Sequence, residues 1–392
     1  MIVQFAGDFR STYYALRSGG AETYYAQGQS IDAVADLATD GREVVTICCT
    51  ADEAYDEMLA PGLRAIGIKP GPRDVDHAEV WRQVQRYRPT HLLLRSPFLG
   101  LLWRARLRHI PVLLTIADSF SQERLIDRLR LKLLVALMNA PGVAAIANHG
   151  RRSAAALIDL GVDQRRVCAW DWPHSLRPHD APAKVAPAGR VWTLFFAGGI
   201  IESKGVGDAI RAVAELERRG LEVRLQMAGS GDIEAFASLA HKLGVGARVD
   251  LLGRRAHSEV IALMRASDLV LVPSRHEYPE GFPMTLFEAL AMRTPIVASD
   301  HPMFVHSLIN RRTAMVFPAG DALALADCVT TLRTEPRLYE RLSYDAVSTW
   351  EALQVPVEWS AMLRAWFLGP PEEFERLLSV GRNDLAINRR VT

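Results

Sequence analysis

Residues 273–290 read Pro-Ser-Arg-His-Glu-Tyr-Pro-Glu-Gly-Phe-Pro-Met-Thr-Leu-Phe-Glu-Ala-Leu. An apolar run of strand length ends at Pro273, a loop carries Glu280 and Gly281, and a helical pattern begins at Pro283. Proline suits the first turn of a helix, where its missing N–H costs no hydrogen bond. A glycine lets a ligand approach the backbone closely. Because a helix start also offers free N–H groups and a positive dipole end, the stretch predicts a phosphate site between a strand and a helix.

Glu280 and Glu288 could be taken for the two carboxylates of a glycosidase. Helical rise over the residues between them gives a separation of roughly 12 Å, whereas glycosidases hold the two carboxyl groups within about 10 Å. Two acceptors this far apart, on either side of a phosphate site, suit a ligand with a sugar at one end and a ribose at the other. The alternative is a pair of surface glutamates near a helix start, where acidic side chains are favoured.

Apolar runs of strand length alternate with amphipathic segments of helix length through most of the chain, which predicts parallel sheets covered on both faces. In the first half we expect strands at 2–7, 43–50, 63–68, 91–95, 112–118 and 143–148, and helices at 21–38, 75–87 and 121–138. In the second half we expect strands at 193–197, 223–228, 249–252, 269–273, 296–299 and 315–317, and helices at 205–219, 233–243, 258–266, 283–292 and 322–334.

The alternation pauses in residues 173–189, where prolines stand at 173, 178, 182 and 187, as is typical of a linker. At 392 residues the chain is long enough for two domains. We therefore expect doubly wound α/β domains at 1–180 and 181–355, with a binding cleft between the carboxyl ends of their sheets. Residues 356–392 are an amphipathic tail, expected to pack back on the N-terminal domain.

Composition excludes several classes of protein. A formal net charge of +1 gives no support to a nucleic-acid partner. The four cysteines show no paired spacing and no histidine cluster, so we expect neither a disulfide framework nor a metal site. The sequence opens on a strand-like run without a basic leader, and it has no apolar stretch of membrane-spanning length. The expected location is the cytoplasm, and no cofactor is expected.

Two glycine pairs mark further loops. A strand runs into Gly198-Gly199, and Lys204 lies where the next helix opens, a position from which an ammonium group can neutralise a diphosphate leaving group. Gly19-Gly20 follow the first strand and could turn backbone amides toward the cleft. Neither loop has the pattern of a dinucleotide dehydrogenase or of a P-loop enzyme, so both classes are disfavoured.

The string Glu280-Gly-Phe-Pro…Glu288-Ala resembles the E-x7-E motif of retaining GT-B glycosyltransferases, specifically glycosyltransferase family 4 (glycosyl transferases group 1). Other stretches resemble that family in order and spacing: Gly198…Lys204-Gly205, 228–232, Leu252-Gly253, 266–268, 273–274 and 295–297. The resemblance covers nearly all of 191–332, and is looser in the first half, where it rests on residues 19–22. It implies a GT-B architecture, an α/β fold with two Rossmann-like doubly wound parallel sheets facing a cleft.

The resemblance also implies roles for residues. Glu288 would bind the ribose hydroxyls of the nucleotide and Glu280 the hydroxyls of the donor sugar, while the backbone of Gly281, Phe282 and Pro283 would contact sugar and phosphates. Lys204 would pair with the diphosphate, and Gly19 and Gly20 would close over it. Arg254 lies where the family holds the base. The candidate catalytic residues are Glu280, Lys204 and Asp118, in a same-face, retaining transfer that needs no protein nucleophile and no metal.

The chain departs from the family at two positions. Gly199 stands where an arginine is common, and Ala117 where a histidine is common. Losing a cation from a leaving-group clamp costs transition-state stabilisation, which Arg275, Arg254 or His276 could supply. We keep Gly199 and Arg275 among the expected donor-binding residues.

A run of cations lies between residues 82 and 132, interleaved with leucines at 99–107 and 125–138; it consists of Arg82, Arg86, Arg88, Arg95, Arg104, Arg106, Arg108, Arg124, Arg128, Arg130 and Lys132. A basic amphipathic surface suits an anionic membrane that carries a lipid-linked acceptor; solvated arginines over a helical core are the alternative. Trp170 and Trp172 could line an acceptor pocket or pack in the core.

The sequence therefore predicts transfer of a hexose from a nucleotide-diphosphate sugar to a glycan or lipid-linked saccharide, as in cell-surface polysaccharide synthesis. The alternatives are a non-catalytic protein with a degenerate donor site, a nucleotide-sugar epimerase, or a phosphorylase.

Overall fold

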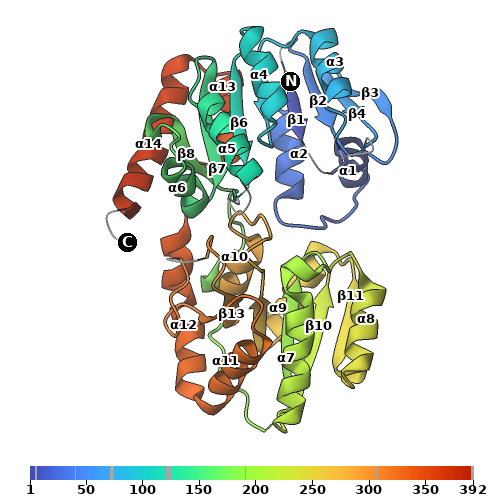
Figure 1. The fold of residues 1–392 in the computed structure, drawn as a ribbon, viewed down its shortest axis with the longest axis vertical. Coiled ribbons are helices and arrows are strands. Elements are labelled where there is room, and N and C mark those ends of the chain that lie inside the picture. The colour runs from blue at the N-terminus through green and yellow to red at the C-terminus, as the bar shows by residue number, and fades with distance from the viewer. Residues whose placement is uncertain are drawn as a thin grey trace. The chain divides into compact units, whose positions relative to one another are not determined.

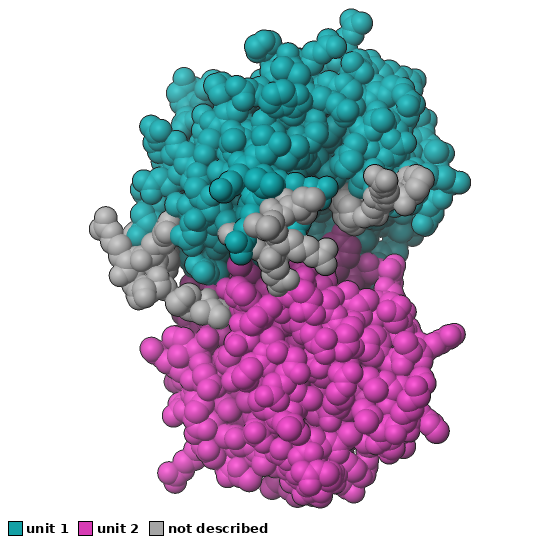
Figure 2. Space-filling view, viewed as in Figure 1, with its two compact units in different colours: residues 1–21, 26–173, 355–392 teal, residues 22–25, 174–354 magenta. Residues whose placement is uncertain are grey.

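The computed structural model describes residues 1–4, 7–39, 41–70, 75–117, 119–120, 125–189, 191–304 and 307–389. The chain forms two compact units, drawn in teal and magenta in Figure 2. Unit 1 comprises residues 1–21, 26–173 and 355–392, and unit 2 comprises residues 22–25 and 174–354. The expected division was 1–180, 181–355 and 356–392, whereas the boundary between the units falls after Pro173 and residues 22–25 belong to unit 2. Residues 355–392 belong to unit 1, the N-terminal unit on which the tail was expected to pack.

Unit 1 is built on a sheet of eight strands in the order β3-β4-β2-β1-β5-β6-β7-β8. Its strands are β1 (Ile2–Gln4), β2 (Val44–Cys48), β3 (Tyr55–Ala60), β4 (Leu63–Gly67), β5 (Leu92–Leu94), β6 (Val112–Ile116), β7 (Val143–His149) and β8 (Val167–Trp170). All neighbours pair in parallel except β3, which runs antiparallel to β4. Strands β3 and β8 were not predicted. The half-exposed edge strand β3 carries two acidic residues and so lacks an apolar run.

Helices cover both faces of this sheet. They are α1 (Phe9–Arg17), α2 (Gln27–Ala35), α3 (His77–Tyr87), α4 (Leu99–Leu107), α5 (Leu125–Met138), α6 (Arg151–Asp159), α13 (Trp359–Phe367) and α14 (Pro371–Arg389), with short 3-10 turns at Gln164–Arg166 and, in unit 2, Pro178–Asp180 (Figure 1). Leu92 and Leu94 join one buried cluster whereas Leu93 joins another, because successive side chains of a strand point to opposite faces. The tail enters the core through α13, which packs on α2, and α14, which packs on β8.

The predicted helix at 21–38 is wrong in its first part. The chain instead forms α1 before residue 18 and α2 from Gln27 onward. Gly19 and Gly20 end α1: the Gly20 N–H donates to Ala15 O (2.8 Å) and the Gly19 N–H to Leu16 O (3.1 Å). Gly19 has φ +83°, so this is a left-handed helix cap that favours glycine. Capping of α1 is therefore sufficient to explain the two glycines, independently of any contact with a ligand.

Unit 2 has six parallel strands in the order β11-β10-β9-β12-β13-β14. They are β9 (Trp192–Ala197), β10 (Val223–Ala228), β11 (Val249–Gly253), β12 (Leu269–Val272), β13 (Ile296–Ser299) and β14 (Met315–Phe317). Its helices are α7 (Val206–Arg218), α8 (Ile233–Lys242), α9 (His257–Ala266), α10 (Met284–Ala291), α11 (Ala322–Thr334) and α12 (Pro336–Leu353), with 3-10 turns at Glu202–Lys204 and Gly246–Arg248. Figure 1 shows α7 and α8 alongside β10 and β11.

The strand order of unit 2 reverses at β9. From β9 the chain first builds outward through β10 and β11, and it then returns to place β12 on the other side of β9. In open parallel sheets, ligands bind outside the carboxyl ends of the two strands at such a reversal. The loop after β9 leads to Lys204, and the loop after β12 leads to Glu280. Topology therefore places both residues at the expected ligand-binding edge of unit 2.

These two loops approach each other through a glycine. Gly205 has φ +73°, and a Cβ at this position would lie 2.0 Å from the carbonyl oxygen of Pro273. Gly220, at the end of α7, has the same φ, but a Cβ there would meet nothing within 4 Å. The two glycines share the backbone requirement and differ in the space around them.

We predict that Gly205→Ala destabilises unit 2 far more than Gly220→Ala. The control should lose about 1–2 kcal/mol, the cost of a left-handed alanine. Gly205→Ala should lose on the order of 3 kcal/mol or more, since the Pro273 carbonyl must also move. Urea unfolding of the two variants measures the difference, and equal losses would show that the close approach to Pro273 is unimportant.

Candidate functional site

Glu280 forms a buried ion pair with Lys204. The Glu280 residue is 5% exposed, and its Oε1 accepts hydrogen bonds from Lys204 Nζ and from Ser274 Oγ (2.7 Å). The Lys204 ammonium also lies 4.2 Å from the centre of the Tyr278 ring, a cation–π contact. A buried carboxylate requires such partners, because desolvation without them costs several kcal/mol. The pair joins the loop after β9 to the loop after β12.

Glu288 has a different partner. It lies on α10, is 6% exposed, and its Oε1 is 2.7 Å from Nε2 of His257, the first residue of α9. The hydrogen bond to Glu288 raises the pKa of His257 above its ordinary value, against the opposing effect of burial. The carboxylate therefore faces an imidazole that holds its proton more strongly than a free histidine does.

The two glutamates do not act as a pair. Glu280 lies in the loop before α10, and that helix begins at Met284 with Pro283 as its N-cap, one residue later than expected. Helical rise therefore does not apply to the whole stretch between them. Each carboxylate binds its own basic side chain, Lys204 or His257, and not the other carboxylate. This arrangement gives no support to a glycosidase.

His301 forms a hydrogen bond with the loop after β12. This histidine is 1% exposed; its Nε2 lies 3.0 Å from Tyr278 O, and its Nδ1 accepts from Met303 N (3.2 Å). Since Nδ1 accepts, the ring is neutral with the proton on Nε2, which agrees with burial lowering its pKa. Phe282 completes the loop by packing edge-on against Phe287, with 5.3 Å between ring centres. His301 was not among the predicted site residues, although it lies two residues after the predicted strand at 296–299.

Arg275 forms hydrogen bonds with two acidic residues of unit 2, and its contact with the diphosphate stays a prediction. Its Nε and Nη2 each donate to Asp208 at 2.7 Å, and Nη2 also donates to Glu202 at 2.6 Å. Asp208 is 1% exposed. The side-chain hydrogen bond with Asp208 raises the pKa of Arg275 further. His276 likewise pairs with Asp300 (2.9 Å).

The remaining residues expected at the donor site differ in their exposure and in their contacts. Arg254 is exposed, directly after β11. A Cβ at Gly199 would make only an ordinary 3.8 Å contact with the Ile201 side chain, so the fold does not demand glycine there. Gly19 and Gly20 belong to unit 1, where their N–H groups cap α1, and their contact with a diphosphate stays a prediction. Ala117 is exposed after β6, and Asp118 lies outside the described residues.

Trp170 and Trp172 have different environments in unit 1. Trp170 is 2% exposed and donates from its indole to Ile116 O (3.1 Å), so it is a core residue. Trp172 is half-buried and packs against Trp359 (5.1 Å between ring centres), over which Arg95 lies at 4.8 Å. A role in acceptor binding stays a prediction for Trp172 alone.

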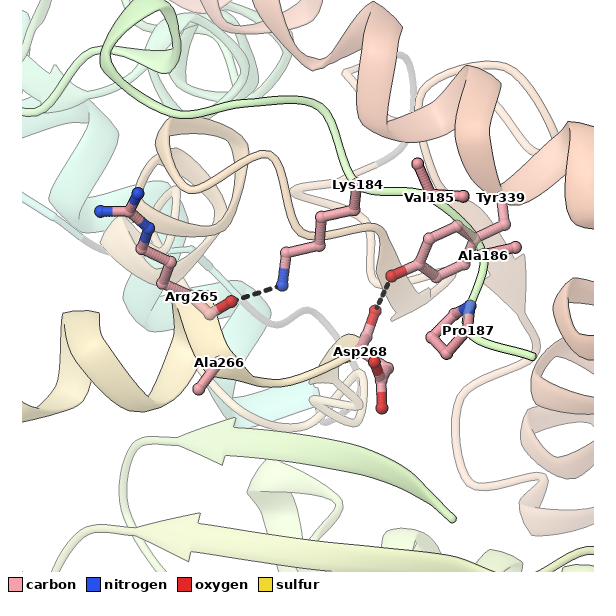
Figure 3. A pocket seen from close by; sticks show the side chains of 8 residues that line it. All are labelled: Lys184, Val185, Ala186, Pro187, Arg265, Ala266, Asp268 and Tyr339. Atoms are coloured by element: carbon pink, nitrogen blue, oxygen red, sulfur yellow. Dashed lines mark hydrogen bonds between the residues drawn. The ribbon is translucent and has the colours of Figure 1, made fainter. Parts of the chain in front are cut away.

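A shallow depression of unit 2 lies beside the linker and is separate from these residues. Figure 3 shows its lining: Lys184, Val185, Ala186, Pro187, Arg265, Ala266, Asp268 and Tyr339. Lys184 fixes the linker to α9 and α12, since its Nζ donates to Arg265 O (2.6 Å) and its backbone N–H to Ser343 Oγ (2.7 Å). Tyr339 OH donates to Asp268 O (3.0 Å), which joins α12 to the segment before β12. None of the expected site residues lines it.

Within the described ranges, no three His, Cys, Asp or Glu side chains are grouped so that they could hold a metal ion. The four cysteines are buried free thiols. Over the same part of the chain, no helix has both the length and the apolar composition needed to cross a bilayer.

Residues 180–348 match the family model of the glycosyl transferases group 1. These residues are a glycosyl transferases group 1 domain. Among curated relatives, alpha-D-kanosaminyltransferase of Streptomyces kanamyceticus is 31% identical over 154 residues, which is 39% of this chain and 39% of that enzyme. The match thus spans about two fifths of the relative's length and leaves the rest of both chains unmatched.

Solved structures extend the likeness to both units. Sucrose-phosphate synthase from Thermosynechococcus elongatus is similar with a TM-score of 0.66 at 17% identity, over 96% of this chain and 98% of that one. HepE of Anabaena in complex with UDP and glucose is similar with a TM-score of 0.64 at 15% identity, over 90% and 94%. At these identities the likeness concerns the fold, and it confirms the GT-B architecture around the glycosyl transferases group 1 domain.

The contacts of Arg275 predict a structural role in this domain. Arg275→Ala should lower the unfolding midpoint of unit 2 by roughly 5 °C, since Asp208 would keep only its contact with Arg211. Arg254→Ala, an exposed control, should stay within about 0.5 kcal/mol of the parent. Differential scanning calorimetry compares them, and a stable Arg275→Ala variant would contradict the structural assignment.

Proposed function

We propose that the protein is a retaining glycosyltransferase that moves a hexose from a nucleotide-diphosphate sugar to a glycan or lipid-linked saccharide. The observation that carries this proposal is the position of the Lys204–Glu280 pair at the strand reversal of a glycosyl transferases group 1 domain. A basic side chain and a carboxylate are held together there by two loops, before any ligand is present.

The chemistry follows from this geometry. The bond between the anomeric carbon and the diphosphate oxygen breaks, and negative charge develops on the leaving group. Lys204 is already fixed at this edge, so it can stabilise that charge without reorganising. Glu280 accepts from hydroxyls of the sugar and orients it. The acceptor oxygen bonds to the anomeric carbon on the face that the diphosphate leaves, and its proton passes to the departing phosphate oxygen.

UDP is the first nucleotide to test, because the structurally similar HepE of Anabaena binds UDP and glucose. Glu288, buried on α10, would accept from the ribose hydroxyls. Gly281, Phe282 and Pro283 would offer backbone to the sugar and phosphates, and Arg254 would lie at the base. Gly199 leaves the diphosphate with one cation fewer than the family usually provides, which is the observation that favours a non-catalytic protein as the second candidate.

Thermal stabilisation by UDP, GDP, ADP, CMP and dTDP, each with and without a sugar, tests the proposal. A ligand at a hundred times its Kd stabilises the folded state by about 2.7 kcal/mol. Glu288→Ala should abolish the shift with the bare nucleotide, whereas Glu280→Ala should keep that shift and lose the additional effect of the sugar. Wild-type shifts in both variants would contradict the assigned roles.

Turnover separates the two candidate functions. Release of nucleoside diphosphate from the stabilising donor would support an enzyme, while binding without turnover over many acceptors would favour the non-catalytic protein. A protein that none of the nucleotides stabilises would contradict the proposed enzyme and favour the non-catalytic protein with a degenerate donor site.

The acceptor side of the proposal includes an anionic membrane. Helices α4 and α5 bury residues in the same cluster, so they cover the same face of the unit 1 sheet. Their outer sides expose large apolar side chains four residues apart on each helix: Trp103 (48%), Leu107 (61%), Leu129 (67%) and Leu133 (48%). The segments 99–108 and 125–138 carry one acidic residue against six cations, Arg104, Arg106, Arg108, Arg128, Arg130 and Lys132.

This combination fits the surface of an anionic bilayer. Apolar side chains insert at the boundary of headgroups and acyl chains, and each nearby cation adds about 1 kcal/mol on an anionic surface. The chain as a whole has a net charge of only +1, so the positive charge of these helices is a local feature. Outside these two helices, arginines of the same run of cations form ion pairs, for example Arg86 with Asp56 (2.9 Å).

We predict that the protein binds vesicles of phosphatidylglycerol and phosphatidylcholine, and binds pure phosphatidylcholine at least tenfold more weakly. Leu129→Asp with Leu133→Asp should reduce flotation with anionic vesicles at least tenfold, because buried apolar area is lost and charge is added. Leu323→Asp, an equally exposed leucine of unit 2 (58%), is the matched control. Unchanged flotation of the double variant would contradict docking through this face.

A further inference from the structure

Residues 22–25 lie in the sequence between Gly20 and α2, yet they belong to unit 2. The carbonyl oxygen of Glu22 accepts a hydrogen bond from the backbone N–H of His257 (2.8 Å). The first N–H groups of a helix have no partner inside the helix, and His257 is the first residue of α9. The segment therefore supplies an acceptor that α9 needs at its N-terminus.

Tyr25 fixes the segment to the side of His257. Its ring meets the His257 ring edge-on, with 5.6 Å between centres and 72° between planes. Its hydroxyl accepts from the backbone N–H of Ser175 (2.8 Å), and its ring stacks on His174 at 5.6 Å. Tyr25 is 6% exposed, so this contact is a packed one. The His257 ring is thus limited in its rotation on this side.

The same column of rings reaches α10. His174 lies 4.1 Å from the centre of Phe287, the residue before Glu288. Glu288 in turn contacts His257 through Oε1 at 2.7 Å. The imidazole and the carboxylate are therefore both anchored to Tyr25, one directly and one through His174 and Phe287.

We propose that His257 is a positioning residue for Glu288, and that the segment 22–25 holds His257 in place. The selectivity of the donor site for a ribose would then depend on a segment from the N-terminal part of the chain. This inference rests on the proposed function, in which Glu288 accepts from the ribose hydroxyls.

The geometry leaves room for both partners. His257 uses Oε1 alone, so Oε2 can accept a ribose hydroxyl, and a carboxylate oxygen has two acceptor positions. An unheld glutamate would lose side-chain freedom when ribose binds, and that loss weakens binding. With His257 in place, the side chain of Glu288 loses this freedom when the protein folds, and the loss no longer weakens ribose binding. The carboxylates of Glu288 and Glu22 both raise the pKa of His257, which is consistent with this role.

Calorimetry with UDP and 2′-deoxy-UDP tests the inference, because the two ligands differ at a ribose hydroxyl. His257→Ala should weaken the binding of UDP about tenfold, which corresponds to the loss of one hydrogen bond to a charged group. The affinity for 2′-deoxy-UDP should change much less. His257→Gln places an amide N–H near the position of the imidazole Nε2, and should recover most of the preference for UDP. If another nucleotide stabilises the protein in the thermal panel, that nucleotide and its 2′-deoxy form replace the UDP pair.

Tyr25→Ala should reduce the preference for UDP over 2′-deoxy-UDP by a smaller factor, because His257 keeps its imidazole N–H but loses the packing of the Tyr25 ring. Tyr24→Ala, an adjacent tyrosine that is 59% exposed, is the matched control and should bind as the parent does. An equal loss of both ligands in His257→Ala, without rescue by glutamine, would show a purely structural role and overturn the inference.

Glu288→Ala separates this inference from the proposed function. If Glu288→Ala loses the preference for the ribose while His257→Ala retains it, the proposed role of Glu288 stands and the positioning role fails. If Glu288→Ala retains the preference, the role of Glu288 fails, and the inference fails with it.

Discussion

The ion pair between Lys204 and Glu280 ties together the two loops at the strand reversal of unit 2. Burying two charges is unfavourable unless each has a partner, so removing either Lys204 or Glu280 alone would leave an unpaired buried charge between the loops. Two further contacts support this approach: Gly205 lies against the Pro273 carbonyl, and the Arg275 N–H donates to Ser203 O (2.9 Å). These contacts pack the two loops against each other at the edge of unit 2 where we propose the donor site.

Charge in this region is balanced locally. Glu280 has Lys204, Glu288 has His257, and Asp208 has Arg275. The three pairs differ in what they leave available. Arg275 donates from Nε and Nη2 to Asp208 and Glu202, whereas Lys204 contacts a single carboxylate oxygen and keeps further donors for a phosphate. Arg254 is exposed, so its proposed contact with the base would break no buried ion pair.

The two units also exchange segments of sequence. Residues 355–392 return to unit 1, where Trp359 is fully buried, and residues 22–25 belong to unit 2. Trp359, Met362 and Leu363 join the cluster that contains Ile2 and Leu93, so the tail completes a face of the first sheet. Each exchange satisfies a local need: the tail covers apolar surface, and Glu22 supplies an acceptor to the start of α9.

Local patterns in the sequence determined the alternation of strands and helices and the glycines at the loops, because strand and helix periods and backbone freedom depend on near neighbours. Such patterns also singled out Glu280, Glu288 and Lys204 as candidate site residues. Only the tertiary structure decided how those residues are paired. His257 meets Glu288 across 31 positions, Lys204 meets Glu280 across 76, and Arg275 reaches Asp208 across 67. Such contacts depend on strand order and on side-chain packing. For the same reason, the acidic partners of Arg275 and the place of residues 22–25 in unit 2 could not be predicted from the sequence.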